Sequence, residues 1–143
     1  GFVGVAGTCL FKHSGVWWEG LNQSPGHLNP LTGLVYHGTP GKMRETYYGP
    51  CGRAAVLDGV FLATTGKVLN TISLKKPKFF TGDWDFYDIF YTGQTYLRNL
   101  KNYTVPIQVV HSSVGEIDGK EGWHKNREAF VRNFSDKLPF SVR

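Results

Sequence analysis

The sequence predicts an α/β protein in which a mixed β-sheet is flanked by helices and long loops. Two apolar segments, 2–7 and 56–64, have the length and the β-branched content of buried strands. From residue 86 onward the apolar residues recur at helical spacing, and an amphipathic segment follows at 123–134. The resulting order of strand, loops, strand, helix, strand and helix is typical of a layered sheet protein.

The first third of the chain combines short strands with long loops. Residues 2–7 read "FVGVAG", an apolar run that ends in glycine. Residues 13–33 are rich in Gly, Pro and His, which excludes a long helix or strand there. The segment "LVYH" at 34–37 predicts a second short strand, and further turns follow it through "ETYYGP" at 45–50. Loops of this length in a compact domain are usually functional or mobile.

The second apolar block, residues 53–69, predicts a strand over 56–64 and a helical turn near 67–69. Asp58 and Gly59 interrupt this block, although both residue types disfavour the interior of a strand. A bulge, the close approach of a ligand, or a hairpin turn at the "DG" pair would each explain them. The sequence leaves these three alternatives open.

Two helices and one more strand complete the predicted fold. The spacing predicts one helical face formed by Phe86, Ile89, Phe90, Gly93, Leu97 and Leu100. Residues 102–111 predict a turn and then a strand, in which Pro106 requires an edge, a bulge or the strand's start. The closing helix at 123–134 is expected to bury Trp123, Phe130, Val131 and Phe134.

Bulk properties limit the possible functions. The 143 residues contain no repeat or shift in composition, so we expect one domain, 1–143. The net charge of +5 favours anionic partners such as phosphates and nucleotides, but the dispersed basic residues argue against nucleic acid. No membrane span or signal peptide is visible, which predicts a cytoplasmic location. Cys9 and Cys51 are too few for a disulfide scaffold, and we expect buried free thiols.

Three carboxylates lie among aromatic rings where the first long helix is expected to begin. Asp83 and Asp85 precede the helix, and we expect one of them to cap it, because Asp is a good N-cap residue and suits the positive end of the helix dipole. Asp88 falls in the first turn, where the helix dipole would hold the carboxylate ionised, as a general base requires. The neighbouring rings would exclude water and offer a surface on which a sugar could stack.

His111 ends an apolar strand and begins a polar loop. Open α/β sheets bind ligands at the carboxyl ends of their strands, so its imidazole could face a cleft. A histidine that is merely hydrogen-bonded at the end of a strand is the alternative. The other four histidines show no metal-ligand spacing.

Several segments, taken in order, resemble a known family. These are "GVAGT", "GVWWEG", "VLDGVFLATTGKVL", "WDFYDIFYTGQTYLR", "VVHSSVG" and "WHKNREAF". The set resembles the acceptor-side, C-terminal half of a glycosyltransferase family 2-like enzyme with a GT-A fold, from Val3 to about Phe134. The resemblance implies an inverting transfer of a sugar from a nucleotide-diphosphate donor to the hydroxyl of a carbohydrate acceptor. It also implies a divalent cofactor, Mn²⁺ or Mg²⁺, which would bridge the diphosphate of the donor and is expected only with the complete nucleotide site.

The resemblance assigns roles to individual residues. Asp88 corresponds to the catalytic base, and His111 to a late histidine that joins the metal ligands in some members of the family. Asp58 and Gly59 correspond to the "DG" pair beneath the donor sugar and the acceptor pocket. The remaining substrate-binding positions are aromatic residues of the acceptor side and one acid: Trp17, Trp18, Trp84 at the rim of the pocket, and Asp85.

The chain also departs from the family's pattern. Phe90 stands where the family commonly has the second acid of the helix-start motif. The nucleotide-binding half, with its metal-binding DxD motif, would precede Gly1. We therefore expect the isolated chain to be an inactive fragment that can self-associate through an exposed sheet edge.

Two other functions remain open from the sequence. A non-catalytic carbohydrate-binding module would use the tryptophans and tyrosines to stack sugar rings. A metal-dependent hydrolase would use Asp83, Asp85 and His111 as ligands.

Overall fold

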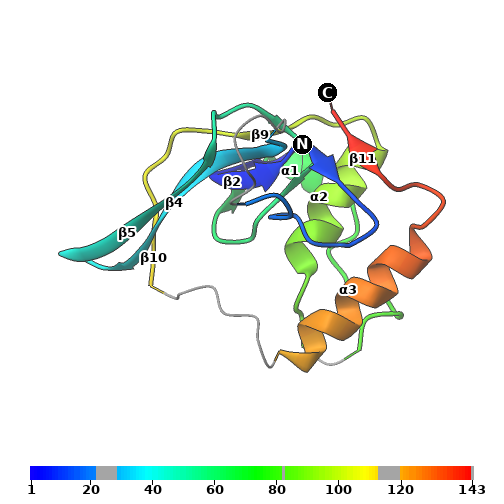
Figure 1. The fold of residues 1–143 in the computed structure, drawn as a ribbon. Helices are drawn as coiled ribbons and strands as arrows, with labels where there is room; N and C mark the ends of the chain where they lie inside the picture. Colours follow the sequence, from blue (N-terminus) through cyan, green and yellow to red (C-terminus); the bar gives the residue numbers. More distant parts are fainter. Residues whose placement is uncertain (22–28, 82, 113–119, 143) are drawn as a thin grey trace.

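The computed structural model describes residues 1–21, 29–81, 83–112 and 120–142. Within these residues the chain forms a mixed α/β fold, with three small β-sheets and three helices (Figure 1). The mixed α/β class agrees with the sequence-based prediction. No helix in the described part of the chain is long and apolar enough to cross a lipid bilayer.

The largest sheet is built around β4 (Leu31–Thr39). One edge of β4 pairs antiparallel with β2 (Ala6–Thr8) and, farther along, parallel with β10 (Val110–His111). Its other edge pairs antiparallel with β5 (Lys42–Gly49), and β7 (Val56–Leu57) continues the sheet beyond β2. The outer edge of β5 pairs with no other strand in the described ranges, and such an edge is available to another chain.

A second sheet joins β1 (Val3–Gly4) to β8 (Leu62–Ala63) and β9 (Asn102–Thr104), with β6 (Arg53–Ala54) beyond β9. A third, two-stranded sheet pairs β3 (Leu10–Phe11) with β11 (Phe140–Ser141).

The two predicted strands at 2–7 and 56–64 are each divided between the first and second sheets. β1 and β2 separate at Val5, and β7 and β8 separate over residues 58–61. The Asp58–Gly59 pair is therefore neither a bulge nor a two-residue hairpin. It lies where the chain leaves one sheet for the other, which frees both residues from strand pairing.

The predicted strand at 34–37 is confirmed as part of β4, but the hairpin with β5 was not predicted, since turns were expected after residue 37. Most of β5 is exposed and carries charged residues, so its sequence lacks the alternation of a half-buried strand. β5 is a strand because it pairs with the more apolar β4. Gly33 has a φ of +100° at an irregularity in the β4–β5 register, a conformation that favours glycine. The hairpin then extends away from the body of the molecule (Figure 1).

The helices are α1 (Gly66–Leu69), α2 (Tyr87–Leu97) and α3 (Glu121–Asn133). The predicted face of α2 is confirmed at Ile89, Phe90 and Gly93, which are buried, and Phe86 is buried just before the helix. Leu97 is exposed and Leu100 is only partly buried, because the helix ends at Leu97.

The predicted helix at 123–134 is α3, shifted by two residues at its start. Trp123 and Phe130 are buried as expected. Val131 and Phe134 are only partly buried but still pack against the core, and Asn126 and Ala129 are buried beside them on α3.

One aromatic core connects the two long helices to the sheets. Phe130 contacts Phe86 at 5.5 Å, Phe11 at 6.1 Å and Phe140 at 6.4 Å between ring centroids. All four rings are almost fully buried, so this cluster fixes α3 against the start of α2. Neither cysteine forms a disulfide within the described residues. The expectation of burial is wrong for Cys51, which is exposed, and Cys9 is only partly buried.

Candidate functional site

A pocket of about 370 Å³ lies between one face of the β4–β5 hairpin, the end of β7 and the starts of α2 and α3. We call the face of the hairpin that carries Val35, His37 and Arg44 its pocket-facing side. Its volume falls in the range of small-molecule sites. Polar groups in its wall comprise two acids, two imidazoles and two cations, and the remaining positions are mostly aromatic or aliphatic. The lining consists of Trp17, Trp18, Leu21, Val35, His37, Arg44, Thr46, Tyr48, Asp58, Val60, Phe86, Asp88, Ile89, His111, Lys120 and Trp123.

Asp88 reaches this pocket because of an unusual start to α2. The residue at the N-cap is Phe86, which has a φ of +72° and makes no side-chain capping bond. A bulky residue in this left-handed region costs roughly 1–2 kcal/mol, and burial of its ring in the aromatic core offsets that cost. The prediction that Asp83 or Asp85 caps the helix is therefore wrong.

Two backbone groups hold the carboxylate of Asp88. The N–H of Gly59 donates to Oδ2 at 2.9 Å, and the N–H of Ile89 donates to Oδ1 at 2.8 Å. Burial nevertheless raises the pKa of Asp88 to about 7, and the negative charge of Asp58 adds to this rise. The expectation that the helix start keeps this acid firmly ionised is corrected, because loss of water outweighs the N–H dipoles.

Asp58 is the second acid of the pocket. Its Oδ1 accepts a hydrogen bond from the N–H of Val60 at 2.9 Å, and its carboxylate accepts another from the indole of Trp17. Burial raises the pKa of Asp58, while these donors and the nearby imidazoles of His111 and His37 oppose the rise. The charge of Asp58 in turn raises the pKa of Asp88, so the two acids titrate as a pair.

Gly59 connects the two acids and lies close to the first turn of α2. A Cβ at this position would lie 2.6 Å from the hydroxyl of Tyr87 and 3.1 Å from Cβ of Asp88. The Tyr87 hydroxyl also donates to the carbonyl of Gly59 at 3.2 Å. The close neighbour of the "DG" pair is therefore α2, whereas the close approach of a ligand, one explanation that the sequence left open, stays a prediction.

His111 faces His37 across neighbouring strands on the same side of the sheet. The two residues are partners in the parallel β4–β10 register, and their ring centroids lie 5.5 Å apart. Both line the pocket, so the expected cleft at the end of this strand is present. His37 was not singled out from the sequence, because its role depends on pairing with a strand more than seventy residues away.

The aromatic residues divide into two groups. Trp17 is buried, its ring lies 5.1 Å from that of Tyr48 between centroids, and its indole donates a hydrogen bond to Asp58. It therefore positions the acid and exposes little ring surface on which a sugar could stack. Trp18 is partly buried at the pocket wall and contacts Trp123 at 5.5 Å.

Trp84 and Asp85 do not line this pocket. Trp84 packs against Phe80 and Tyr91, so its expected place at the rim is not supported. Asp83 and Asp85 line a separate hollow beside the start of α3. Because His111 lies in the other pocket, the structure does not assemble the ligand set expected for a metal-dependent hydrolase.

A metal site is not complete in the described residues. They contain no cluster of three or more His, Cys, Asp or Glu side chains with the geometry to hold a metal ion. His111 has His37 as an imidazole neighbour. Mg²⁺ is usually held by one or two carboxylates together with substrate phosphates and water. The divalent ion that the family resemblance implies stays a prediction.

Three buried polar residues hold the elements around the site. Thr92 accepts from the N–H of Leu57 at 3.2 Å and so ties α2 to β7. Asn102 donates to the carbonyl of Thr92 at 3.0 Å. Asn126 of α3 donates to the carbonyl of Asp85 at 2.8 Å and fixes the segment that precedes α2. The sequence signalled none of them, since an Asn or Thr is ordinarily a surface residue.

Comparison of the chain with protein-family models, curated proteins and solved structures gives no match. The resemblance to sugar transferases therefore remains a hypothesis.

Proposed function

We propose that this chain supplies the acceptor pocket and the general base of an inverting sugar transferase. The observation that carries the proposal is the position of Asp88, an acid with a pKa of about 7 in the wall of a sugar-sized pocket. A general base works best when its pKa is close to the working pH. At neutral pH a large fraction of Asp88 is ionised and can accept a proton.

In this proposal the hydroxyl of the acceptor sugar lies beside the carboxylate of Asp88. The hydroxyl oxygen attacks the anomeric carbon of the donor sugar while its proton passes to Asp88. The bond between the anomeric carbon and the diphosphate oxygen breaks, and the leaving group takes that electron pair. Each carboxylate oxygen of Asp88 already accepts one backbone hydrogen bond, which fixes its orientation while leaving a lone pair for the proton.

Other residues of the pocket support this role. Asp58 raises the pKa of Asp88 through its charge, so the base is strong enough to accept the proton. Trp18 and Trp123 offer apolar ring surface in the pocket wall, and sugar rings stack on such surfaces.

The test compares Asp88→Asn with Asp83→Asn in the full natural protein that carries this sequence. A panel of nucleotide sugars and saccharide acceptors is assayed for transfer. We expect Asp88→Asn to lower kcat by roughly 10²- to 10⁴-fold with little change in acceptor affinity. Asp83 is exposed and lies outside the pocket, so its variant serves as a control of equal charge change. Unchanged turnover in Asp88→Asn would refute the proposal.

The second candidate is a carbohydrate-binding module without catalysis. The aromatic wall of the pocket favours it, because ring stacking alone is sufficient for binding. The two desolvated acids favour the transferase, since burying a carboxyl pair is costly and binding does not require it. Sugar binding that survives Asp88→Asn, in a protein that transfers no sugar from any donor, would support the binding module.

A further inference from the structure

The pocket-facing side of the β4–β5 hairpin carries a row of three nitrogen-bearing side chains. Arg44 on β5 is the register partner of His37 on β4, and His37 is in turn the register partner of His111 on β10. Residues in direct register lie on the same face of a sheet, with neighbouring strands about 4.8 Å apart. All three side chains line the pocket, and the row therefore forms one wall of it.

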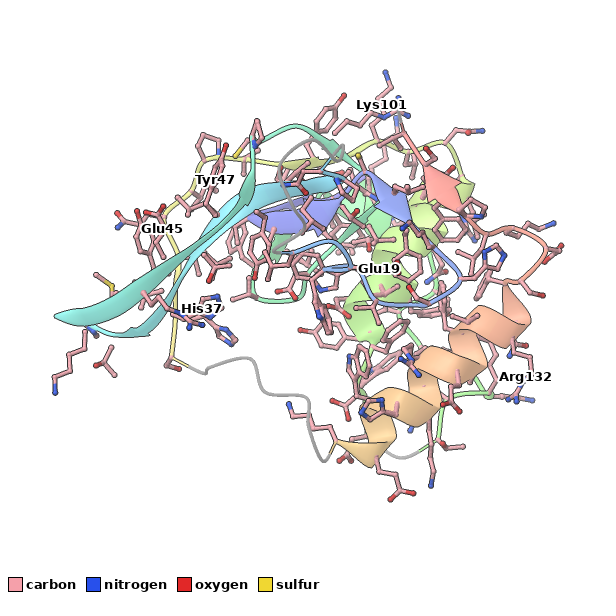
Figure 2. The ribbon with its side chains drawn as sticks, viewed as in Figure 1. Glu19, His37, Glu45, Tyr47, Lys101 and Arg132 are labelled. Atoms are coloured by element: carbon pink, nitrogen blue, oxygen red, sulfur yellow. The ribbon has the colours of Figure 1, made fainter. Side chains whose placement is uncertain are left out.

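The acid of the hairpin lies on the opposite face. Glu45 is adjacent to Arg44 and accepts a hydrogen bond from the hydroxyl of Tyr36, whose pKa is raised by this contact. Figure 2 shows His37 on one side of the hairpin and Glu45 and Tyr47 on the other. Within the described ranges no carboxylate lies within 4 Å of the guanidinium of Arg44.

A row of positively charged side chains in this arrangement lowers the stability of the folded sheet. Like charges directly opposite each other on neighbouring strands destabilise a sheet. Arg44 is always charged, and both imidazoles gain charge when they are protonated. Lys120, an exposed cation at the start of α3, adds to the positive wall. Asp58, which follows β7, interacts electrostatically with both imidazoles, whereas Arg44 has no carboxylate within 4 Å in the described residues.

We propose that Arg44, His37 and His111 bind an oxyanion of the ligand, a phosphate or a carboxylate group. Guanidinium matches the geometry of both groups with two parallel donors, and an imidazole N–H adds a third donor from the next strand. The inference deepens the proposed function and rests on it for the sugar nature of the ligand. It names the chemical class of one ligand group: the diphosphate of a nucleotide sugar, or the carboxylate of an acidic sugar.

Titrations of the chain with three probes test the inference. Pyrophosphate represents the diphosphate, glucuronate represents an acidic sugar, and glucose is the neutral reference. Fluorescence reports binding, because Trp17, Trp18 and Trp123 line the pocket. We expect at least one oxyanion to bind with a Kd of about 1 mM or below. Binding of pyrophosphate alone assigns the row to the donor, and binding of glucuronate alone assigns it to an acidic sugar.

The decisive variant is Arg44→Gln, with Lys42→Gln as its matched control. Both residues are exposed on β5 and both changes remove one positive charge, but only Arg44 lines the pocket. We expect Arg44→Gln to raise the Kd of the oxyanion roughly tenfold and Lys42→Gln to change it less than twofold. Equal thermal melting of both variants would verify that the fold is intact.

Two outcomes would overturn the inference. One is the failure of both oxyanions to bind the wild-type chain. The other is an equal loss of affinity in Arg44→Gln and Lys42→Gln, which would indicate a general effect of net charge. These outcomes are separate from the proposed function, because the transfer assay with Asp88→Asn tests the base and the oxyanion titration requires no turnover.

Discussion

Replacing Asp88 with Asn is expected to change the stability of the protein in a direction that depends on pH. The pKa of Asp88 rises from 3.8 to about 7 in the folded protein. Because the folded pKa lies above the unfolded one, the folded state binds more protons between these two pH values. The free energy of unfolding therefore falls as the pH rises from about 4 to 7. A helix-start acid that is held ionised would give the opposite slope.

The size of the effect follows from the pKa and the hydrogen bonds. At about 1.36 kcal/mol for each pH unit, ionised Asp88 destabilises the folded state by at most about 4 kcal/mol at pH 8. An amide in its place accepts from only one of the two backbone N–H groups, at Gly59 or Ile89, which costs about 1 kcal/mol at every pH. Asp88 lines an open pocket, so screening by water reduces the gain. We expect Asp88→Asn to destabilise the protein by about 1 kcal/mol at pH 4 and to stabilise it by about 2 kcal/mol at pH 8.

The assay is urea unfolding at several pH values between 4 and 8, followed by tryptophan fluorescence. Subtracting the variant from the wild type removes the contributions of other titrating groups that both proteins share. Asp83→Asn is the control, and its effect should stay within about 0.5 kcal/mol because Asp83 is exposed. A stability difference for Asp88→Asn that is constant with pH, or that grows more unfavourable at high pH, would refute the reasoning.

Three further predictions concern the elements around the pocket. Gly59→Ala should destabilise the protein by about 1–3 kcal/mol in urea unfolding, because the new methyl meets a tyrosine hydroxyl of α2; Gly52→Ala, in open space, should cost less than about 1 kcal/mol. Trp18→Ala should weaken sugar binding at least roughly fivefold in a fluorescence titration, whereas Trp84→Ala, outside the pocket, should not; equal losses would contradict the assignment of the wall. Asn126→Ala should lower stability by about 2 kcal/mol, since buried backbone groups lose their partners, and a melting temperature equal to that of the wild type would exclude this role.

The helices illustrate what local pattern can predict. The apolar spacing of α2 and α3 follows the helical repeat, and the structure confirms both within a few residues. The hairpin of β4 and β5 could not be predicted in the same way, because β5 is mostly exposed and has no alternation. Its strand exists through pairing with β4, and pairing partners are a property of the whole fold.

The candidate site shows the same division. Three site residues were singled out from the sequence. Asp58 interrupts a predicted strand, Asp88 falls in the first turn of a predicted helix, and His111 ends an apolar strand. Trp84 and Asp85 were assigned to the same pocket by resemblance, and the structure places them elsewhere. His37 and Arg44 gave no local signal, since their position depends on the register of three strands.

The sequence by itself determined the mixed α/β class, the two long helices and the presence of unusual acids beside aromatic rings. These features depend on residue spacing and composition within short segments. Only the tertiary structure decided that Asp58 and Asp88 share one pocket with His111, and that Asp88 has a raised pKa. The reason is that proximity and loss of water are set by atoms from distant segments, and no local pattern records them.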